Sequence, residues 1–347
     1  MIKVLVVDDS PVMREFLVGL LRADPEIEVV STAGDGEQAV QMALHHRPHV
    51  ITMDINMPNM NGFEATRKIM ETVPTPIVIV TGSVDPKAVA TTFQAMEAGA
   101  LMVLPRPQGP GHPDHAAMAR ELVLNVKLMS EVKVVRRSPR ARAQPTAPPP
   151  KIERATPQVQ VVALGASTGG PIVIHTIISK LPRNFPLPLL IVQHMAPGFI
   201  SGFAQWLSES TQVPVHVARD GELMLPGHAY LAPDSFQMGV GLGYRIRLAD
   251  DEAENGLRPS VSYLFRSVSD AFGPDAAGVL LTGMGRDGAA ELKLMRDRGA
   301  VTFAQDESSS VVHGMPGEAI RLGAAARVLP PEKIAEEIAL LAQNKQR

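Results

Sequence analysis

Short apolar runs, each followed by a helical pattern, recur along most of this chain, and this alternation limits the possible folds more than any other feature of the sequence. From Met1 to Leu128 the runs are IKVLVV, IEVVST, HVITM, PIVIV and ALMVL. From about Val159 a second series includes VQVVAL, LPLLIV, VPVHV, AGVLL and AVTFA. Because buried strands that alternate with helices form parallel sheets, the sequence predicts two α/β domains, and the first is a doubly wound domain of five strands.

Two further segments complete the second series. Between Gly227 and Leu248 the short runs AYLAP, FQMGV and YRIRL predict the strands of a hairpin or meander. The chain ends in an apolar stripe at helical spacing, which predicts an amphipathic helix from about Pro331 to Ala342.

A segment of different composition separates the two series. Residues 129–157 are rich in Pro, Arg and Ala and show no apolar periodicity. Such a segment cannot bury enough surface to offset the entropy of ordering it, so we expect a tether whose arginines are either solvated or docked on an acidic partner. The predicted organisation is a domain at 1–128, a Pro/Arg-rich linker at 129–157 and a second domain at 158–347.

The composition excludes several classes of function. The chain has no cysteine, which rules out disulfides, thiolate catalysis and Cys-type zinc sites. A formal net charge of −3 provides no overall attraction to nucleic acid or to an anionic membrane. No apolar stretch reaches the roughly 18 residues of a spanning helix, and the N-terminal run is too short for a signal peptide. We expect a monomeric cytoplasmic protein that neither binds nucleic acid nor inserts into a membrane.

Three acidic residues stand where strands of the first domain are predicted to end. Asp8 and Asp9 follow the first strand, and Asp54 follows the third. These strands are neighbours in a doubly wound sheet, so the carboxylates should converge, and Mg²⁺ is the natural cation to hold them. One carboxylate can then attack a phosphoryl group, and the hydroxyl of Thr81, at the end of the fourth strand, can hold a phosphoryl oxygen. Taken singly, each acid is more readily explained as an ordinary loop-starting residue, but Asp8, Asp9, Asp54 and Thr81 in register favour the phosphorylation site.

A serine, a histidine and an aspartate each follow a predicted strand of the second domain. Ser167 lies in GASTGG after VQVVAL, His194 in QHM after LPLLIV, and Asp287 in GMGRDG after AGVLL. The carboxyl ends of parallel strands form the crevice in which ligands bind. A serine hydroxyl becomes an effective nucleophile when a histidine takes its proton and an acid orients that histidine. The three positions therefore predict the catalytic triad of a serine hydrolase.

Each of these three signals has another explanation when it is taken alone. The pentapeptide GASTG fits a G-x-S-x-G nucleophile turn, but chance or a phosphate-binding loop would also explain it. His194 is one of ten histidines, and Asp287 between glycines is equally a turn-forming residue or a helix cap. The order serine, histidine, acid differs from that of the α/β-hydrolases, so we expect another parallel-sheet scaffold.

The first series resembles a response-regulator receiver domain, a flavodoxin-like fold, in the segments VLVVDDS, MDINMPNMNG and IVTGS. The resemblance implies that Asp54 is phosphorylated, that Asp8, Asp9 and Asp54 hold Mg²⁺, and that Thr81 is the switch hydroxyl. The chain departs from the family pattern at Arg106 in LPRPQG, where a lysine is usual. Arginine keeps the positive charge but presents a planar fork in place of a compact ammonium.

The second series resembles the catalytic domain of chemotaxis protein-glutamate methylesterases, the CheB family. The similar segments are GASTGGP, QHMAPGF, PGHAYLAP, RPSV, LTGMGRDGA and QDESSSVVHGMPGEA. With the receiver domain and the linker, the resemblance covers essentially the whole chain. It implies that Ser167 is the nucleophile, His194 the general base and Asp287 the orienting acid. The backbone N–H of Met284 is then a candidate oxyanion donor, and Thr168 lies beside the nucleophile.

Four positions depart from the methylesterase pattern. Leu257 and His313 replace a histidine and an aromatic residue, and Ser262 replaces an aspartate. Gln237 stands where a histidine commonly follows the LAP segment. These changes fall in segments expected to frame the active site, so we expect them to affect substrate choice or rate.

The resemblance implies a phosphorylation-activated hydrolase that demethylates glutamate methyl esters on chemoreceptors and that in many family members also deamidates glutamines. A chemotaxis histidine kinase is the implied phosphodonor, Mg²⁺ is the implied cofactor of the receiver domain, and the esterase needs no cofactor. Two alternatives stay open. One is a phosphorylation-controlled binding module with an idle catalytic domain, and the other is a methylesterase of a chemosensory-like pathway unrelated to motility.

Overall fold

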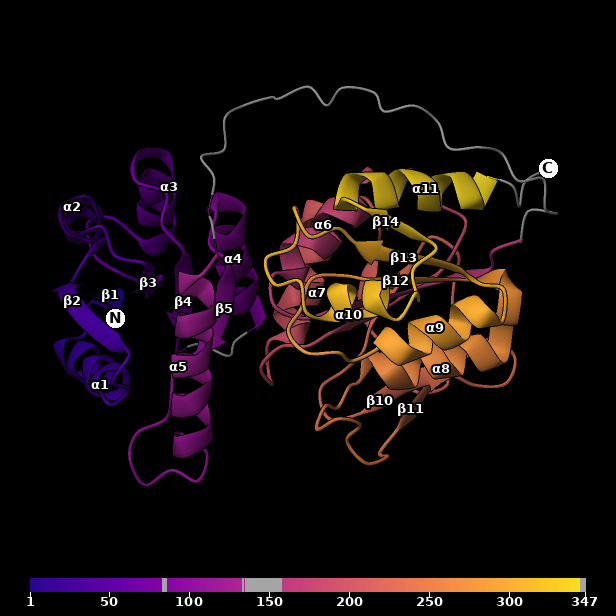
Figure 1. Ribbon diagram of the computed structural model, residues 1–347, viewed down its shortest axis with the longest axis horizontal. Coiled ribbons are helices and arrows are strands. Elements are labelled where there is room, and N and C mark those ends of the chain that lie inside the picture. Colours follow the sequence, from indigo (N-terminus) through magenta and orange to yellow (C-terminus); the bar gives the residue numbers. More distant parts are fainter. Residues whose placement is uncertain (83–85, 133, 135–157, 344–347) are drawn as a thin grey trace. The chain divides into compact units, whose positions relative to one another are not determined.

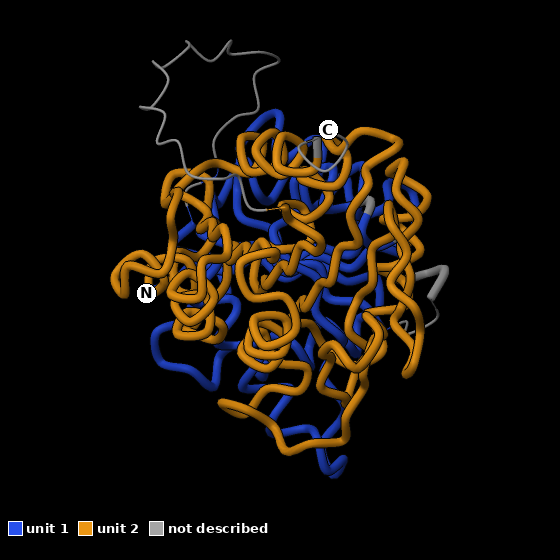
Figure 2. The backbone as a smooth tube through the Cα atoms, turned by 90° about the vertical axis from the view of Figure 1, so that its right-hand side faces the viewer, with its two compact units in different colours: residues 1–84, 91–150 blue, residues 85–90, 151–347 orange. Residues whose placement is uncertain are grey.

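The computed structural model describes residues 1–82, 86–132, 134 and 158–343. The chain divides into two compact units, the first of residues 1–84 and 91–150 and the second of residues 85–90 and 151–347 (Figure 2). Both units contain a parallel sheet, which confirms the predicted α/β class. Of the predicted linker, residue 133 and residues 135–157 lie outside the described residues.

Unit 1 is built on five parallel strands in the order β2-β1-β3-β4-β5 (Figure 1). The strands are β1 (Ile2–Val7), β2 (Ile27–Ala33), β3 (Val50–Met53), β4 (Ile77–Thr81) and β5 (Met102–Pro105). The helices are α1 (Pro11–Arg22), α2 (Gly36–His46), α3 (Gly62–Thr72), α4 (Pro86–Ala98) and α5 (His115–Ser130). The first strand therefore lies inside the sheet, and the chain reverses its winding direction beside it, as in a doubly wound fold.

Apolar side chains from α2, α3 and α4 share one buried cluster with the strands of unit 1. Ala39, Ile69 and Ala95 represent the three helices in it. Polar caps fix where the helices begin: Asp35 accepts from the N–H of Gln38 at 2.8 Å, and the side chain of Asn61 caps α3 in a capping box. In this way each helix starts at a defined distance from the strand that precedes it.

Two features of unit 1 differ from the sequence-based expectation. The last helix continues through Ser130, so the first residues assigned to the linker are helical. The apolar residues between Val12 and Leu21 recur at helical spacing, which predicts one buried stripe. In α1, however, Leu17 and Leu21 are buried, whereas the side chain of Val12 is 77% exposed.

Unit 2 is built on seven parallel strands in the order β14-β13-β12-β6-β7-β9-β8. The strands are β6 (Val161–Ala166), β7 (Leu189–Gln193), β8 (Val215–Val217), β9 (Ala229–Leu231), β12 (Ala276–Leu280), β13 (Val301–Gln305) and β14 (Arg327–Leu329). A separate antiparallel pair consists of β10 (Gln237–Val240) and β11 (Ile246–Ala249). The predicted hairpin is thus formed by β10 and β11, whereas the AYL segment joins the main sheet as β9.

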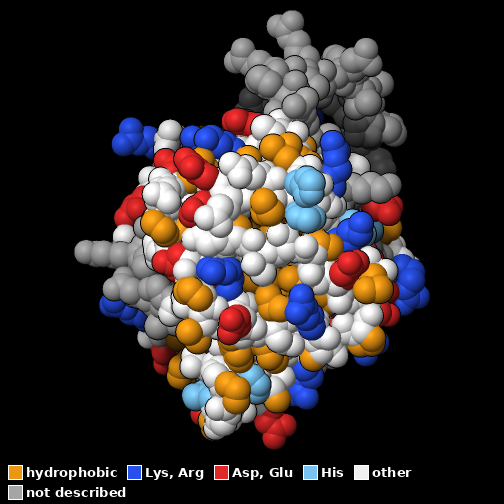
Figure 3. Space-filling model, turned by 90° about the vertical axis from the view of Figure 1, so that its left-hand side faces the viewer, with side chains coloured by type: hydrophobic (Ala, Val, Ile, Leu, Met, Phe, Trp, Pro, Cys, Tyr) orange, Lys and Arg blue, Asp and Glu red, His pale blue; other side chains and the backbone are white. Residues whose placement is uncertain are grey.

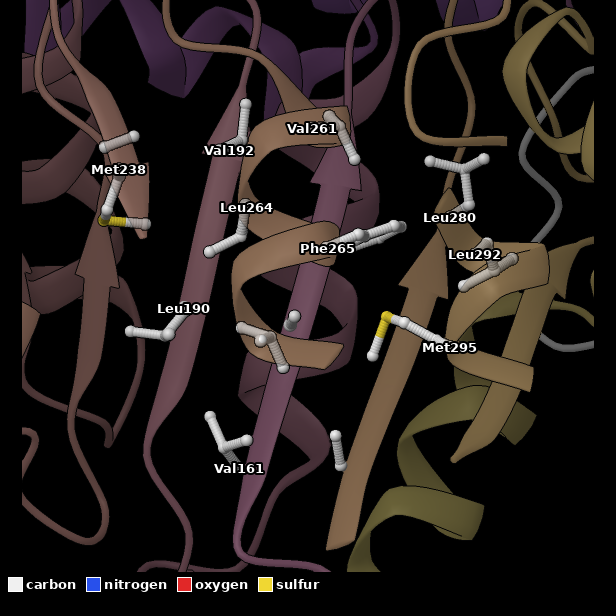
Figure 4. Packing of buried hydrophobic residues seen from close by; sticks show 14 of the residues in the cluster. Val161, Leu190, Val192, Met238, Val261, Leu264, Phe265, Leu280, Leu292 and Met295 are labelled. Atoms are coloured by element: carbon white, nitrogen blue, oxygen red, sulfur yellow. The ribbon is translucent and has the colours of Figure 1, made fainter. Parts of the chain in front are cut away.

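The helices of unit 2 connect these strands and cover the sheet. They are α6 (Gly170–Lys180), α7 (Ile200–Ser210), α8 (Val261–Phe272), a short 3-10 helix (Gly273–Asp275), α9 (Ala289–Asp297), α10 (Met315–Arg321) and α11 (Pro331–Gln343). Helix α8 lies over the central strands, and its apolar side chains interdigitate with those of β6, β7, β12 and α9 (Figure 4). Val261, the first residue of α8, lies at the arrowhead end of these strands in the same view.

The register of the central strands sets the geometry of the crevice. Ala166 at the end of β6 pairs with Gln193 at the end of β7, so the residues that follow them start at the same height. On the other side of β6, Gly165 pairs with Leu280 at the end of β12. Three neighbouring strands therefore end side by side, and the segments that carry the predicted triad leave the sheet together.

The charge on one face of the molecule and the length of the described helices bear on possible binding to polyanions and membranes. Acidic and basic side chains are interspersed with apolar ones on the face drawn in Figure 3. None of the helices in the described part of the chain combines the length and the apolar character that crossing a membrane requires.

Candidate active site

Ser167 lies in a sharp turn between β6 and α6. Its backbone N–H donates to the carbonyl of Thr282 at 3.0 Å, and its own carbonyl accepts from the N–H of Gly170 at 2.8 Å. Gly169 has a φ of +78°, a conformation that glycine adopts without strain, and any Cβ there would lie 2.6 Å from Val311. The GASTGG sequence therefore forms the tight strand-to-helix turn that its small residues predict.

Residues Gly283 and Met284 pass directly beside this turn. A Cβ at Gly283 would lie only 2.7 Å from the Cβ of Ser167, so the two backbones touch because one of them is glycine. The N–H groups of Thr168, Gly169 and Met284 donate to no other described residue. Free backbone donors around a nucleophile are what an oxyanion hole requires. The N–H of Met284, the predicted donor, and that of Thr168, predicted only to lie beside Ser167, are both free at this turn.

His194 follows β7 at the height of Ser167. Its backbone N–H donates to the carbonyl of Ala166 at 2.9 Å, which extends the strand pairing by one residue. Nε2 of the ring lies 3.0 Å from Oδ2 of Asp287, although its N–H is not aligned for a hydrogen bond to that oxygen. The contact is therefore an ion pair when the ring is protonated, and Nδ1 is the nitrogen left to act as a base.

The described residues include no hydrogen bond between His194 and the hydroxyl of Ser167. Catalytic hydrogen bonds are often long before substrate binds and shorten in the complex. The structure thus places His194 and Asp287 in direct contact and brings Ser167 to the same end of the sheet.

Three donors hold the carboxylate of Asp287, which is 3% exposed. The hydroxyl of Ser260 (3.0 Å) and the N–H of Ser262 (3.1 Å) donate to Oδ1. The N–H of Val261 (2.7 Å) donates to Oδ2, the oxygen that faces His194. These N–H groups begin helix α8, so the acid sits at the positive end of the helix dipole.

The electrostatics of Asp287 follow from this cradle. Burial alone would raise its pKa, but His194, followed by the hydrogen bonds from Ser262 and Val261, outweighs burial and lowers the pKa to about 2. The acid is therefore ionised over the whole physiological range, as an orienting carboxylate must be.

Two glycines make room for the start of α8. A Cβ at Gly165 would lie 2.3 Å from Val261, and one at Gly288 would lie 2.4 Å from the same side chain. Val261 is therefore wedged between the strand that precedes the nucleophile and the loop that carries the acid. The glycines in GAST and GMGRDG fix the distance between these two segments.

The acidic residues of unit 1 also meet at the carboxyl end of their sheet. One oxygen from each of Asp8, Asp9 and Asp54 lies within 4.8 Å of the others. Three carboxylate oxygens at this spacing fit a hard cation such as Mg²⁺. Thr81 is buried at the end of β4, and its carbonyl accepts from the N–H of Arg106 at 2.7 Å. The structure thus brings together all five residues predicted for this site.

Arg106 supplies the positive charge of the cluster. Its Nη2 lies 2.9 Å from Asp8 and 3.5 Å from Asp54. Burial and the charge of Asp8 raise the pKa of Asp54 to about 6, and Arg106 offsets only part of that shift. The guanidinium lies against Gly82, where a Cβ would approach it to 3.2 Å.

Comparisons with known proteins agree with both sites. A model of the CheB methylesterase family matches residues 162–338, and a model of the response regulator receiver domain matches residues 4–113. The chain belongs to the CheB methylesterase family.

Similar proteins match over their full length. A protein-glutamate methylesterase/protein-glutamine glutaminase of Nitrosospira multiformis is 60% identical over 99% of this chain and 98% of its own length. One of Geobacter metallireducens is 57% identical over 99% of this chain and 100% of its own. The crystal structure of the Thermotoga maritima CheB methylesterase catalytic domain superposes with a TM-score of 0.51 at 36% identity, covering 53% of this chain and 98% of that one.

Three of the positions that depart from the CheB pattern lie behind the acid. Gln237, fully buried, accepts from the N–H of Ser260 at 2.9 Å and donates to the carbonyl of Leu257 at 3.3 Å. The hydroxyl of Ser262 accepts from the N–H of Gly288 at 3.0 Å and donates to Glu291 at 2.6 Å. These side chains therefore support the cradle of the acid in this CheB family member. They do not line the turn of the nucleophile.

The fourth departure, His313, lies in the segment that pairs with the loop of Gly283 and Met284. It forms an isolated parallel bridge with Gly283, and its Nδ1 lies 3.3 Å from the hydroxyl of Ser310. Sequence reasoning missed Ser260, whose position before a helical pattern in RPSV is the usual signal of an N-cap. It also assigned no role to Gln193, although this residue stands beside the base in the QHM motif.

Proposed function

We propose that unit 2 hydrolyses γ-methyl esters of protein glutamate side chains, with Ser167 as nucleophile, His194 as general base and Asp287 as orienting acid. The observation that carries the proposal is the contact of Nε2 of His194 with an acid held by three donors, at the strand end next to Ser167. A buried carboxylate at this distance stabilises the protonated ring that forms during the reaction.

The reaction follows from this arrangement. Nδ1 of His194 takes the proton of the Ser167 hydroxyl, and Oγ attacks the γ-carbonyl carbon of the ester. The carbonyl oxygen becomes an oxyanion, which the free N–H groups of Met284 and Thr168 stabilise. The C–O bond to the methoxy group breaks, and methanol leaves with the proton from His194. Water, deprotonated by His194, then cleaves the acyl-enzyme to release the glutamate carboxylate and the serine hydroxyl.

The same site could release ammonia from a glutamine. An amide carbonyl attacked by Ser167 gives the same acyl-enzyme, and the leaving nitrogen takes its proton from His194 where the ester oxygen would take it. The relatives from Nitrosospira multiformis and Geobacter metallireducens carry both activities in their names. We therefore include deamidation of receptor glutamines in the proposed function.

In unit 1, we propose that Asp54 accepts a phosphoryl group from a chemotaxis histidine kinase. Asp8, Asp9 and Asp54 would hold Mg²⁺, which supplies the positive charge that lets a carboxylate attack an anionic phosphoryl group. The carboxylate oxygen of Asp54 forms the new bond to phosphorus as the bond to the kinase histidine breaks. Arg106 and Thr81 then lie where they can hold the added phosphoryl oxygens.

The partner proteins follow from these two activities. The substrate would be a methylated chemoreceptor, and phosphorylation of Asp54 would raise the rate at which unit 2 demethylates it. We propose that the protein is a monomer and that it works in the cytoplasm.

The test is methanol release from a methylated receptor fragment, with and without acetyl phosphate and Mg²⁺. Wild-type protein should release methanol and do so faster with the phosphodonor. Ser167→Ala should remain folded and phosphorylatable but release no methanol, and Asp54→Asn should keep the unstimulated rate. Full methanol release by Ser167→Ala would exclude the serine mechanism, and equal stimulation of Asp54→Asn would exclude the proposed control.

A further inference from the structure

Gln193 is the last residue of β7, directly before the proposed base. It pairs in register with Ala166, the residue directly before the proposed nucleophile. Its neighbour Val192 points into the apolar cluster under α8, as Figure 4 shows, so Gln193 points to the opposite face of the sheet, toward the start of α6. There its side chain is 3% exposed.

The amide of Gln193 ties the backbones of nucleophile and base together. Its Nε2 donates to the carbonyl of Ser167 at 2.8 Å and to the carbonyl of His194 at 2.8 Å. Strand pairing between the two segments ends with the N–H of His194 on Ala166, so beyond this point the chains are free to separate. Among the described residues, no other side chain bonds to the backbones of both Ser167 and His194.

The other end of the amide has no partner among the described residues. Oε1 of Gln193 is buried and accepts no hydrogen bond, and it lies where a Cβ at Gly170 would approach to 2.1 Å. A buried acceptor without a donor destabilises a fold, and an apolar side chain of the same size would avoid that cost. A methionine or leucine, however, has no donor for the two carbonyls.

We infer that Gln193 is a positioning residue for the hydrolysis. Its amide fixes the distance between the Ser167 and His194 backbones so that the hydroxyl and Nδ1 meet when substrate binds. Gly170 is required for this placement of the amide, because only a residue without a side chain leaves room for Oε1. The inference rests on the proposed function, since it takes Ser167 and His194 to be nucleophile and base.

The test compares Gln193→Met with Thr302→Val, a control that also removes a buried polar group from the same sheet. The Thr302 hydroxyl donates to Ala324 and accepts from Ala326, away from the crevice, so its loss measures stability alone. We expect both variants to lower the melting temperature. Gln193→Met should lower kcat for methanol release by about tenfold to a hundredfold with KM within about twofold, because small misplacements of reacting groups cost rates of that size. Thr302→Val should keep kcat.

A second variant keeps the test decisive if Gln193→Met does not fold. Gln193→Asn retains the two donors on a shorter stem, so it should fold and show an intermediate kcat. Equal kcat values for Gln193→Met or Gln193→Asn and Thr302→Val would overturn the inference. An inactive wild-type protein would instead refute the proposed function, so the two failures are distinguishable.

Discussion

Asp54 and Asp287 occupy corresponding places in the two units, yet their environments drive their pKa values in opposite directions. Each follows the carboxyl end of a parallel sheet, and each is about 95% buried or more. Burial raises the pKa of Asp54 to about 6, whereas donors that outweigh burial bring that of Asp287 down to about 2. Burial makes a carboxylate costly, and the number of fixed donors decides whether it remains ionised.

The donors account for the difference. Asp287 accepts hydrogen bonds from the first N–H groups of a helix and from the hydroxyl of its N-cap, and it lies 3.0 Å from a histidine ring. Asp54 faces two other carboxylates and shares the Arg106 guanidinium with Asp8. The protein's own donors are thus sufficient to keep Asp287 ionised. Asp54 has too little positive charge beside it, and a bound cation, with or without a reacting phosphoryl group, would supply that charge.

The largest expected effect on activity comes from removing the negative charge of Asp287. Asp287→Asn should lower kcat for methanol release by about 10⁴-fold, because the amide turns an N–H toward donors and no longer stabilises the protonated ring. Steady-state methanol release measures it. Asp297→Asn, at the exposed end of α9, is the matched control and should leave kcat unchanged. A loss below about tenfold would show that Asp287 is not the orienting acid.

The two acids should also make stability depend on pH with opposite slopes. The pKa of Asp287 is lowered in the folded protein, so its stabilisation is present above about pH 4 and is lost as pH falls toward 2. The pKa of Asp54 is raised, so in EDTA the folded protein loses stability as pH rises from about 4 through 6, where the buried carboxyl gives up its proton. Each shift corresponds to roughly 2–3 kcal/mol of unfolding free energy.

Urea denaturation of the wild-type protein, Asp54→Asn and Asp287→Asn across this range measures the two contributions. Asp54→Asn should be more stable than the wild type at pH 7 and equal to it near pH 4. Asp287→Asn should be less stable at pH 7 and approach the wild type near pH 2. Parallel pH profiles of the two variants would contradict the comparison.

A smaller effect on kcat is expected from changing Ser262, which supports the segment that carries Asp287. Ser262→Ala leaves the N–H of Gly288 without an acceptor and frees Glu291, so the acid should be held less firmly. We expect kcat to fall by about tenfold and KM to change little. Ser269→Ala removes another buried serine from the same helix, near its far end, and should keep kcat. Equal rates for the two variants would show that Ser262 does not support the acid.

The smallest expected effect is the response of unit 1 to metal. At pH 7, Mg²⁺ should raise the melting temperature of the wild-type protein by about 2–4 °C, because it binds the folded carboxylate cluster. Scanning calorimetry with Mg²⁺ or EDTA measures the shift. Asp8→Asn removes one predicted ligand and should lose it. A shift of the same size in Asp8→Asn would place the metal elsewhere.

The sequence was sufficient for the central strands of both sheets and for the residues that directly follow them. Ser167, His194 and Asp54 directly follow buried strands, and the register of parallel strands brings such positions to one edge without long-range information. The family resemblance then assigned their roles. Arg106 directly follows β5, and its side chain reaches Asp8 and Asp54 at the same edge.

The remainder depends on contacts between distant segments. The cradle of Asp287 comes from residues 260–262, and no local pattern in RPSVSYL shows which loop its helix will meet. The AYL segment was grouped with the hairpin because a three-residue strand has too few positions to show whether one face or both are buried. Val12 continues the apolar stripe of α1 in sequence but lies beyond the part that the sheet covers.

The strand order of unit 2 has a consequence for the synthesis of the protein. Ser167 and His194 directly follow β6 and β7, whereas Asp287, the residues that hold its carboxylate and the loop beside Ser167 come from segments about a hundred residues later. A nascent chain that has left the ribosome only as far as β9 therefore carries a serine and a histidine with no carboxylate to orient them. Esterase activity therefore requires that the segment carrying Asp287 has been translated and that β12 has paired with β6.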